Sequence, residues 1–134
     1  MRILLLVDCY LPSTKSSAKL VHDLAAELVR RGHQPVVAAP ASDLRSRREL
    51  RTEDGIEVLR VRSGRLKGAS HLQRAINEWR LSAVMWRAGQ RYFREHPCEA
   101  IVFYSPSIFF GPLVRRLKRL WGCRAYLILR DIFP

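Results

Sequence analysis

The sequence predicts an α/β fold: a Rossmann-like, mainly parallel sheet with helices on both faces. Ile3 to Val7 is an unbroken apolar run, as expected of a parallel strand that is covered on both sides. After a polar loop, apolar residues recur in pairs every four positions up to Val29, which is the pattern of an amphipathic helix. Gly32 stops this helix, and a second apolar run starts at Gln34. Strand, helix and strand in this order form a βαβ unit.

The later elements continue the alternation. The polar, arginine-rich stretch 40–54 is expected to be a surface loop that ends in an Asp54-Gly55 turn. Ser107 is expected to cap the last helix, which Gly122 ends. The other expected elements are a third, more exposed strand at 56–61, a long helix at 72–95, a fourth strand at 100–104 and a fifth at 124–130.

The long helix has two apolar stripes. One contains Ile76, Trp79 and Trp86, and the other contains Met85 and Tyr92 on roughly the opposite side. Both stripes need cover, so one is expected to pack on the sheet. The second is expected to meet a neighbouring element, a missing domain or a membrane surface.

Composition limits the function classes. The net charge of +12 predicts attraction to nucleic acid, anionic lipid head groups or phosphorylated substrates, and charge alone does not choose among them. The three cysteines form no CxxC pair, which favours buried thiols in a reducing cytoplasm. No apolar run reaches the ~18 residues of a membrane span, and the N-terminus lacks the pattern of a signal peptide. No metal site is predicted, because no histidine has a second ligand at metal spacing.

The size of the chain suits one domain. However, the last strand is not followed by the helix that would cover its face of the sheet. Residues 1–134 are therefore expected to be a single partial domain, truncated after the fifth strand.

The first loop, Asp8 to Ser17, is the first candidate site, because ligands bind at the carboxyl edge of open α/β sheets. It contains no glycine, which argues against a dinucleotide fingerprint and a Walker A loop. Ser16 or Ser17 would cap the following helix, and its free N–H groups with Lys15 would favour an anion. The alternative is an ordinary capped helix start, with Asp8 capping its own turn.

Two further loops would join the first. If the five predicted strands lie in the order 3-2-1-4-5 across the sheet, three loops meet at one carboxyl edge. These loops start at Asp8, Tyr104 and Arg130. Their carboxylates and hydroxyls suit sugar hydroxyl groups, while Arg130 and Lys15 suit phosphates. The alternative is that Arg130 and Asp131 pair with neighbouring residues. The predicted binding residues are Asp8, Lys15, Ser16, Ser17, Tyr104, Ser105 and Ser107.

The segment ILLLVDCYLPSTKSSAKLVHDLAAELVRRGH resembles the opening of the glycosyltransferase family 4 N-terminal domain, which is half of a GT-B fold. YSPSIFFGPLV and AYLILRDIFP resemble the branch of L-fucosamine (N-acetylfucosamine) transferases of O-antigen and capsule synthesis. The likeness runs along essentially the whole chain.

The resemblance implies a retaining transferase that moves a sugar from a nucleotide-sugar to a lipid-linked saccharide, without a metal or other cofactor. The N-terminal domain would hold the acceptor at the inner face of the cytoplasmic membrane. A C-terminal domain, absent here, would hold most of the donor, so this fragment alone is expected to be inactive.

The resemblance also assigns residues. Ser16-Ser17 or nearby residues replace a Gly-Gly pair that many members have near the donor diphosphate. Arg130 stands where many members have a histidine, whereas Asp131 and Pro134 match the family's D-x-x-P ending. Arg130 and Asp131 are thus the predicted catalytic residues.

A nucleic-acid-binding or other polyanion-binding α/β module is the alternative function. Against it, the aromatic residues lie at helical core spacings and no recognised nucleic-acid motif occurs. The arginines of the two later helices instead suit a peripheral protein on anionic lipid.

Overall fold

A computed structural model of the chain describes the backbone of residues 1–7, 10, 16–41, 44–62, 71–104 and 110–128. Within these ranges it also describes the side chains, except those of 16–17, 71–79, 81 and 104. The elements are β1 (Arg2–Leu6), α1 (Ser16–Arg30), β2 (Gln34–Ala41), β3 (Arg48–Glu53), β4 (Ile56–Arg62), α2 (His71–Glu95), β5 (Ala100–Tyr104), α3 (Gly111–Trp121) and β6 (Arg124–Ile128).

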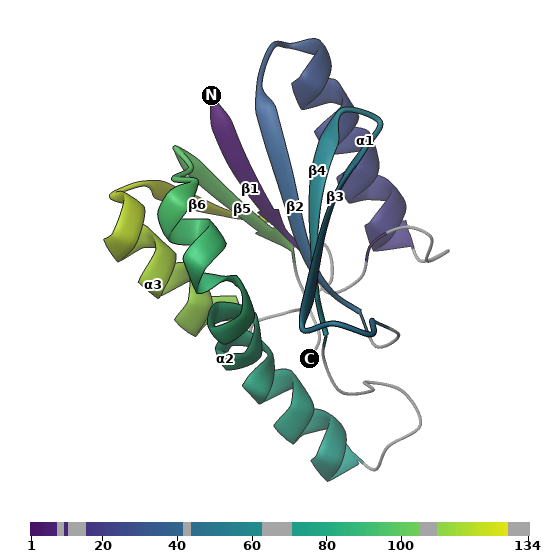
Figure 1. The fold of residues 1–134 in the computed structure, drawn as a ribbon, viewed down its shortest axis with the longest axis vertical. Coiled ribbons are helices and arrows are strands. Elements are labelled where there is room, and N and C mark those ends of the chain that lie inside the picture. Colours follow the sequence, from purple (N-terminus) through teal and green to yellow (C-terminus); the bar gives the residue numbers. More distant parts are fainter. Residues whose placement is uncertain (8–9, 11–15, 42–43, 63–70, 105–109, 129–134) are drawn as a thin grey trace.

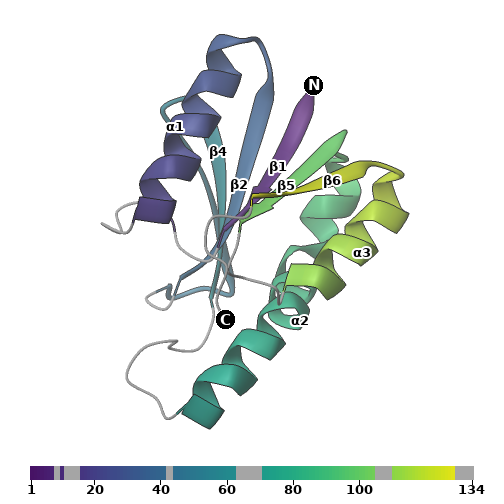
Figure 2. The ribbon, with the colours of Figure 1, turned by 180° about the vertical axis from the view of Figure 1, so that it is seen from behind.

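The sheet has the order β3-β4-β2-β1-β5-β6. Every neighbouring pair is parallel except β3 and β4. In Figures 1 and 2, α1 covers one face of the sheet, and α2 and α3 lie side by side on the other. The predicted fold class is confirmed, and so is the predicted order of the five parallel strands.

The expectation of a loop over residues 40–54 is wrong. Part of it forms β3, which pairs antiparallel with β4 so that Arg48 lies opposite Val61 and Glu53 opposite Ile56. Asp54 and Gly55 both have positive φ, at 54° and 78°, as the tight turn of a β-hairpin requires. The side chains of β3 are mostly charged and half-buried or exposed, as suits an edge strand. The strand at 124–128 is therefore the sixth and not the fifth.

The hairpin also explains why β4 is more buried than predicted. Ile56, Val58, Leu59 and Val61 are all fully buried. β3 covers the open edge of β4, while α1 and α2 lie against its two faces. Burial of such aliphatic side chains stabilises a fold by roughly 1.5–3 kcal/mol each.

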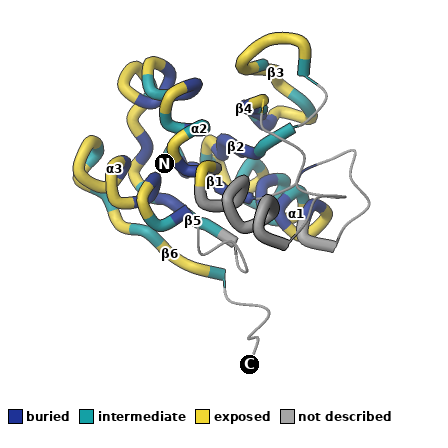
Figure 3. Tube along the Cα trace, turned by 90° about the horizontal axis from the view of Figure 1, so that it is seen from below, coloured by how far each residue is buried: buried dark blue, intermediate teal, exposed yellow. Residues whose placement is uncertain are grey.

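Two apolar cores form because successive residues of a strand point to opposite faces. Leu5 faces α1 and packs in one cluster with Val21 and Ala25. Leu4 faces α2 and α3 and packs in the other with Met85 and Leu117. In Figure 3, buried positions follow the central strands, and exposed positions lie along β3 and the outer sides of the helices.

The ends of α3 are partly as predicted. Phe110 occupies the N-cap position and makes no side-chain capping bond, so the expectation that Ser107 caps this helix is wrong. Phe110 is fully buried and Pro112 lies in the first turn, and together they favour a helix start after Phe110. Gly122 ends the helix as predicted, with φ of 63° and its N–H donating to the Lys118 carbonyl at 2.8 Å.

The two stripes of α2 differ in burial. Met85, Ala88 and Tyr92 are buried in the core against the sheet. On the other stripe Ala83 is exposed and Trp86 is half-buried, while the side chain of Trp79 lies outside the described part. The N-terminal part of α2 extends past the carboxyl ends of the strands (Figures 1 and 2).

A polar cluster joins β1, β4 and α2 at the amino edge of the sheet. Arg2 Nη2 donates to the Tyr92 hydroxyl at 2.6 Å and to Glu57 Oε2 at 3.0 Å, and the same hydroxyl donates to Glu57 at 2.6 Å. Burial and the hydrogen bond to Glu57 raise the pKa of Tyr92. Burial opposes ionisation of Glu57, but the Tyr92 hydrogen bond and the Arg2 charge outweigh it and lower the pKa of Glu57.

Candidate functional site

The carboxyl edge of the sheet gathers three connections of the chain. Leu6 at the end of β1 lies opposite Phe103 of β5, and Tyr104 lies opposite Ile128 at the end of β6. α1 also begins near this edge, at Ser16 (Figure 1). The chain therefore leaves β1, β5 and β6 and enters α1 at one side of the molecule.

The topology changes direction at the same place. From β1 the chain passes through α1 on one face to β2, whereas β5 continues through α3 on the other face to β6. The switch point thus lies between β1 and β5, as the sequence predicts. In open α/β sheets a crevice for ligands forms outside the carboxyl ends at this point.

The backbone of three predicted site residues is described. Ser16 and Ser17 lie inside the first turn of α1, and Tyr104 is the last residue of β5. Ser16 and Ser17 therefore follow the capping position rather than occupying it. The remaining predicted residues, Asp8, Lys15, Ser105, Ser107, Arg130 and Asp131, lie outside the described residues. Their roles stay predictions, as do those of the Ser16, Ser17 and Tyr104 side chains.

A cluster around Tyr10 contains none of the predicted site residues. Tyr10, within the first loop, is buried, and its ring lies 6.2 Å from that of His22 on α1 and 6.0 Å from the Arg60 guanidinium. Arg60 Nη1 also pairs with Glu53 Oε2 at 2.8 Å, and His22 Nε2 lies 3.6 Å from Asp54 Oδ2. Burial and the nearby Glu53 raise the pKa of Tyr10 to about 12, so the phenol is neutral at physiological pH. This cluster joins Tyr10 to α1 and β4.

One signal for this cluster was present in the sequence. Ile56, Val58 and Arg60 alternate along β4 and so point to the same face. Ile56 and Val58 are buried beneath α1, which makes Arg60 a charged residue at an otherwise apolar position. A charge at such a position needs partners, and Tyr10 and Glu53 supply them.

In the part of the chain that the structure describes, no three histidine, cysteine, aspartate or glutamate side chains are grouped so that they could hold a metal ion. No helix in these residues has both the length and the hydropathy of a membrane-spanning segment.

Residues 17–132 match the protein family described as glycosyl transferase 4-like domain. The chain belongs to this family. The general resemblance seen in the sequence, to the N-terminal half of a GT-B glycosyltransferase, is thereby confirmed. Neither the family match nor the similar structures support the narrower likeness to fucosamine transferases.

Solved structures share the fold of this glycosyl transferase 4-like domain. The C-terminal domain of a Pyrococcus furiosus hydrogenase superposes with a TM-score of 0.65 at 11% identity, covering 96% of this chain and 90% of the other. The Escherichia coli trehalose-6-phosphate synthase, solved with UDP-2-fluoro glucose, gives a TM-score of 0.64 at 12% identity. This second match covers all of our chain and 34% of the synthase. No curated protein sequence matches the chain.

Proposed function

We propose that this domain is the acceptor side of a retaining glycosyltransferase that moves a sugar from a nucleotide-sugar to a lipid-linked saccharide. The observation that carries the proposal is the meeting of β1, β5, β6 and the start of α1 at one carboxyl edge, in a chain of the glycosyl transferase 4-like family. Sugar transfer needs a crevice that orients two substrates, and the switch point between β1 and β5 supplies the place for it.

Each predicted residue has a chemical role in this proposal. Lys15 and the N–H groups at the start of α1 would attract the donor diphosphate. Asp8, Tyr104, Ser105 and Ser107 would bind hydroxyl groups of the sugars. Arg130 and Asp131 would lie at the reacting centre, where Arg130 stabilises negative charge on the leaving diphosphate. A second domain would hold most of the nucleotide and close the crevice.

The narrower part of the proposal concerns substrates and location. We propose N-acetyl-L-fucosamine as the transferred sugar and O-antigen or capsule synthesis as the setting, on the strength of the motifs YSPSIFFGPLV and AYLILRDIFP. A lipid-linked acceptor would bring the enzyme to the inner face of the cytoplasmic membrane. The net charge of +12 supports peripheral binding to anionic lipid there.

The test of catalysis uses Arg130→Ala and Asp131→Ala in the longest reading frame that contains this chain. Transfer of labelled sugar to a lipid-linked acceptor should fall by roughly a hundredfold in each variant, as when a charge-stabilising group is removed. Arg124→Ala and Asp23→Ala are matched controls, because both residues are exposed and Arg124 lies at the opposite end of β6. Near-normal transfer in the two test variants would remove both residues from the mechanism.

Donor choice is tested in the same assay. UDP-N-acetyl-L-fucosamine should be used in preference to UDP-glucose and UDP-N-acetylglucosamine. Preference for another sugar would refute the fucosamine assignment and leave the transferase proposal standing. A salt-dependent gel shift with RNA or DNA, together with no sugar transfer, would favour the nucleic-acid-binding alternative.

A further inference from the structure

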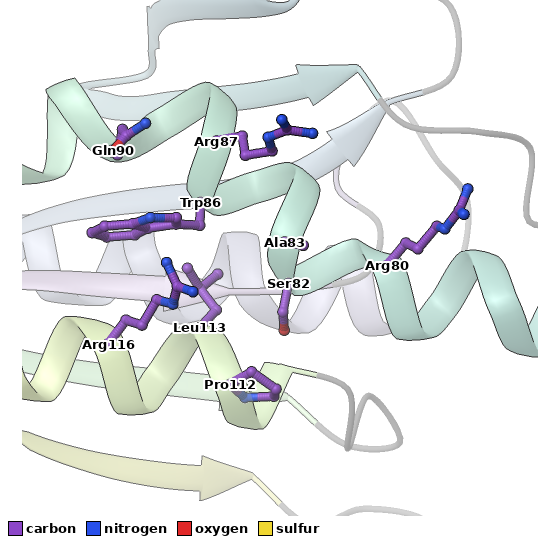
Figure 4. A pocket seen from close by; sticks show the side chains of 9 residues that line it. All are labelled: Arg80, Ser82, Ala83, Trp86, Arg87, Gln90, Pro112, Leu113 and Arg116. Atoms are coloured by element: carbon purple, nitrogen blue, oxygen red, sulfur yellow. The ribbon is translucent and has the colours of Figure 1, made fainter.

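A groove of about 620 Å³ runs between α2 and α3 (Figure 4). It lies between two helices on one face of the sheet, and Pro112 in the first turn of α3 lines it. None of its lining residues is among the residues proposed for sugar transfer. Trp86, Ala83 and Ser82 of α2 face Pro112, Leu113 and Arg116 of α3 across the groove.

The lining combines an apolar floor with cations. Trp86, Ala83, Pro112 and Leu113 supply the apolar surface, and Leu113 is fully buried. Among the described residues, the charged ones that line the groove are Arg80, Arg87 and Arg116, and none of the described lining residues is a carboxylate. In the described part of the chain, no ion pair neutralises these three arginines.

Two arginine side chains lie over the ring of Trp86. The guanidinium of Arg116 lies 5.4 Å from its ring centroid and that of Arg94 lies 5.8 Å from it. Cation–π contact stabilises each arginine but leaves its charge uncompensated. Arg115, Lys118 and Arg119 add to the field from the exposed side of α3, whose first turn carries no acidic residue. An anion in the groove would offset this concentration of charge.

The charge and the apolar floor of the groove together select the occupant. A phosphate group with the first methylenes of an acyl chain fits the volume. Guanidinium groups bind phosphate through paired hydrogen bonds, and tryptophan favours the boundary between apolar chains and head groups.

We propose that the groove between α2 and α3 binds one anionic phospholipid, with Arg116 toward the phosphate, Arg80 and Arg87 at the rim and Trp86 against the acyl chain. This inference rests on the proposed association with anionic membranes and is independent of sugar transfer. It adds to the general electrostatic attraction between protein and membrane one defined binding site for a lipid molecule.

The test is sedimentation of the chain with vesicles of phosphatidylcholine that contain about 30% phosphatidylglycerol, compared with pure phosphatidylcholine. The double variant Arg87→Gln, Arg116→Gln should lose at least about tenfold in vesicle affinity. The matched control is Lys19→Gln, Arg30→Gln, which removes the same charge from exposed positions of α1, on the opposite face of the sheet. The control should lose only a few-fold. Circular dichroism checks that both variants are folded.

A second measurement separates the lipid from its head group. Dioctanoyl phosphatidylglycerol below its micelle concentration should change the tryptophan fluorescence of the wild type, and Trp86→Phe should abolish most of the change. Inorganic phosphate at the same concentration should have no effect. Equal binding of phosphate would overturn the lipid assignment.

The outcomes distinguish this inference from the proposed function. If the wild type binds vesicles, and the groove and control variants lose the same amount of affinity, the groove site is overturned and membrane association stands. No binding of the wild type to anionic vesicles would overturn both the groove site and membrane association. Sugar transfer is measured separately, so its failure would leave the groove site unaffected.

Discussion

At the scale of single residues, the Tyr92 hydroxyl is the centre of the amino-edge cluster. It accepts a hydrogen bond from Arg2 of β1 and donates one to Glu57 of β4, both at 2.6 Å. Tyr92→Phe removes both bonds and leaves two charged groups partly unsatisfied. We expect a loss of about 1.5 kcal/mol in the free energy of unfolding, measured by urea unfolding with circular dichroism.

Tyr126→Phe is the matched control for this prediction. Tyr126 is 53% exposed on β6, and its hydroxyl makes no hydrogen bond in the described part of the chain. The control should unfold like the wild type. If the two variants had the same stability, the cluster would contribute nothing measurable.

Glu57 makes the same cluster sensitive to pH. Because its pKa is lowered in the folded state, the carboxylate stabilises the fold at pH values above its ordinary pKa of 4.5. This contribution is lost as the pH falls below that value and through the lower pKa of the folded state. The stability difference between wild type and Glu57→Gln should therefore be constant near neutral pH and narrow on acidification. A difference that widened in acid would refute the assignment.

The limits of sequence reasoning are also visible in single residues. Asp8, Lys15 and Arg130 could be singled out because each follows or precedes a strongly patterned element. Arg60 contacts Tyr10 of the first loop, yet its partners Tyr10 and Glu53 come from separate segments. Side-chain contacts between distant segments depend on packing that no local pattern encodes.

At the scale of elements, the buried strands and helices could be predicted because their apolar residues follow a clear period. β1 and β5 are unbroken apolar runs, and both form where expected. β3 has the sequence RELRTE without apolar alternation, because an edge strand needs few buried side chains. Its pairing with β4 comes from the tight turn at Asp54-Gly55, which sequence analysis recognised as a turn but not as a hairpin.

Close packing within α2 gives a prediction at this scale. A Cβ atom on Gly89 would lie 2.8 Å from Cε2 and 3.1 Å from Cζ of Phe93. Phe93 is fully buried and packs edge-on against Trp121, so its rigid ring has little room to move. Gly89→Ala gains about 1 kcal/mol of helix propensity, but the overpacking costs roughly 1–3 kcal/mol. We expect a net loss of about 1 kcal/mol in urea unfolding.

Gly111→Ala is the control for the packing argument. Gly111 is the first residue of α3, and a Cβ atom there would meet nothing within 4 Å. The substitution should leave stability unchanged or raise it by up to about 1 kcal/mol. If Gly89→Ala raised stability more than Gly111→Ala, the overpacking argument would be wrong, because the Phe93 ring would then move aside at little energetic cost.

At the scale of the whole molecule, topology decides how much of the candidate site was predictable. Parallel strands end at the same edge, so the order of the strands alone gathers the loops that follow the first, fourth and fifth predicted strands. The groove between α2 and α3 could not be found in this way. It depends on how two helices pack side by side, whereas the sequence showed only an apolar stripe on α2 in need of cover.

The net charge of +12 leads to a prediction for the whole fold. Salt screens repulsion among the excess cations, whereas the ion pairs that it also weakens are mostly exposed, such as Glu27 with Arg30 and Arg31. Repulsion should dominate, so the urea midpoint should rise between about 20 mM and about 300 mM NaCl. Arg115→Gln, Arg119→Gln removes two exposed cations of α3 and should reduce this rise. A midpoint that fell with salt would show that the ion pairs, and not the excess charge, control stability.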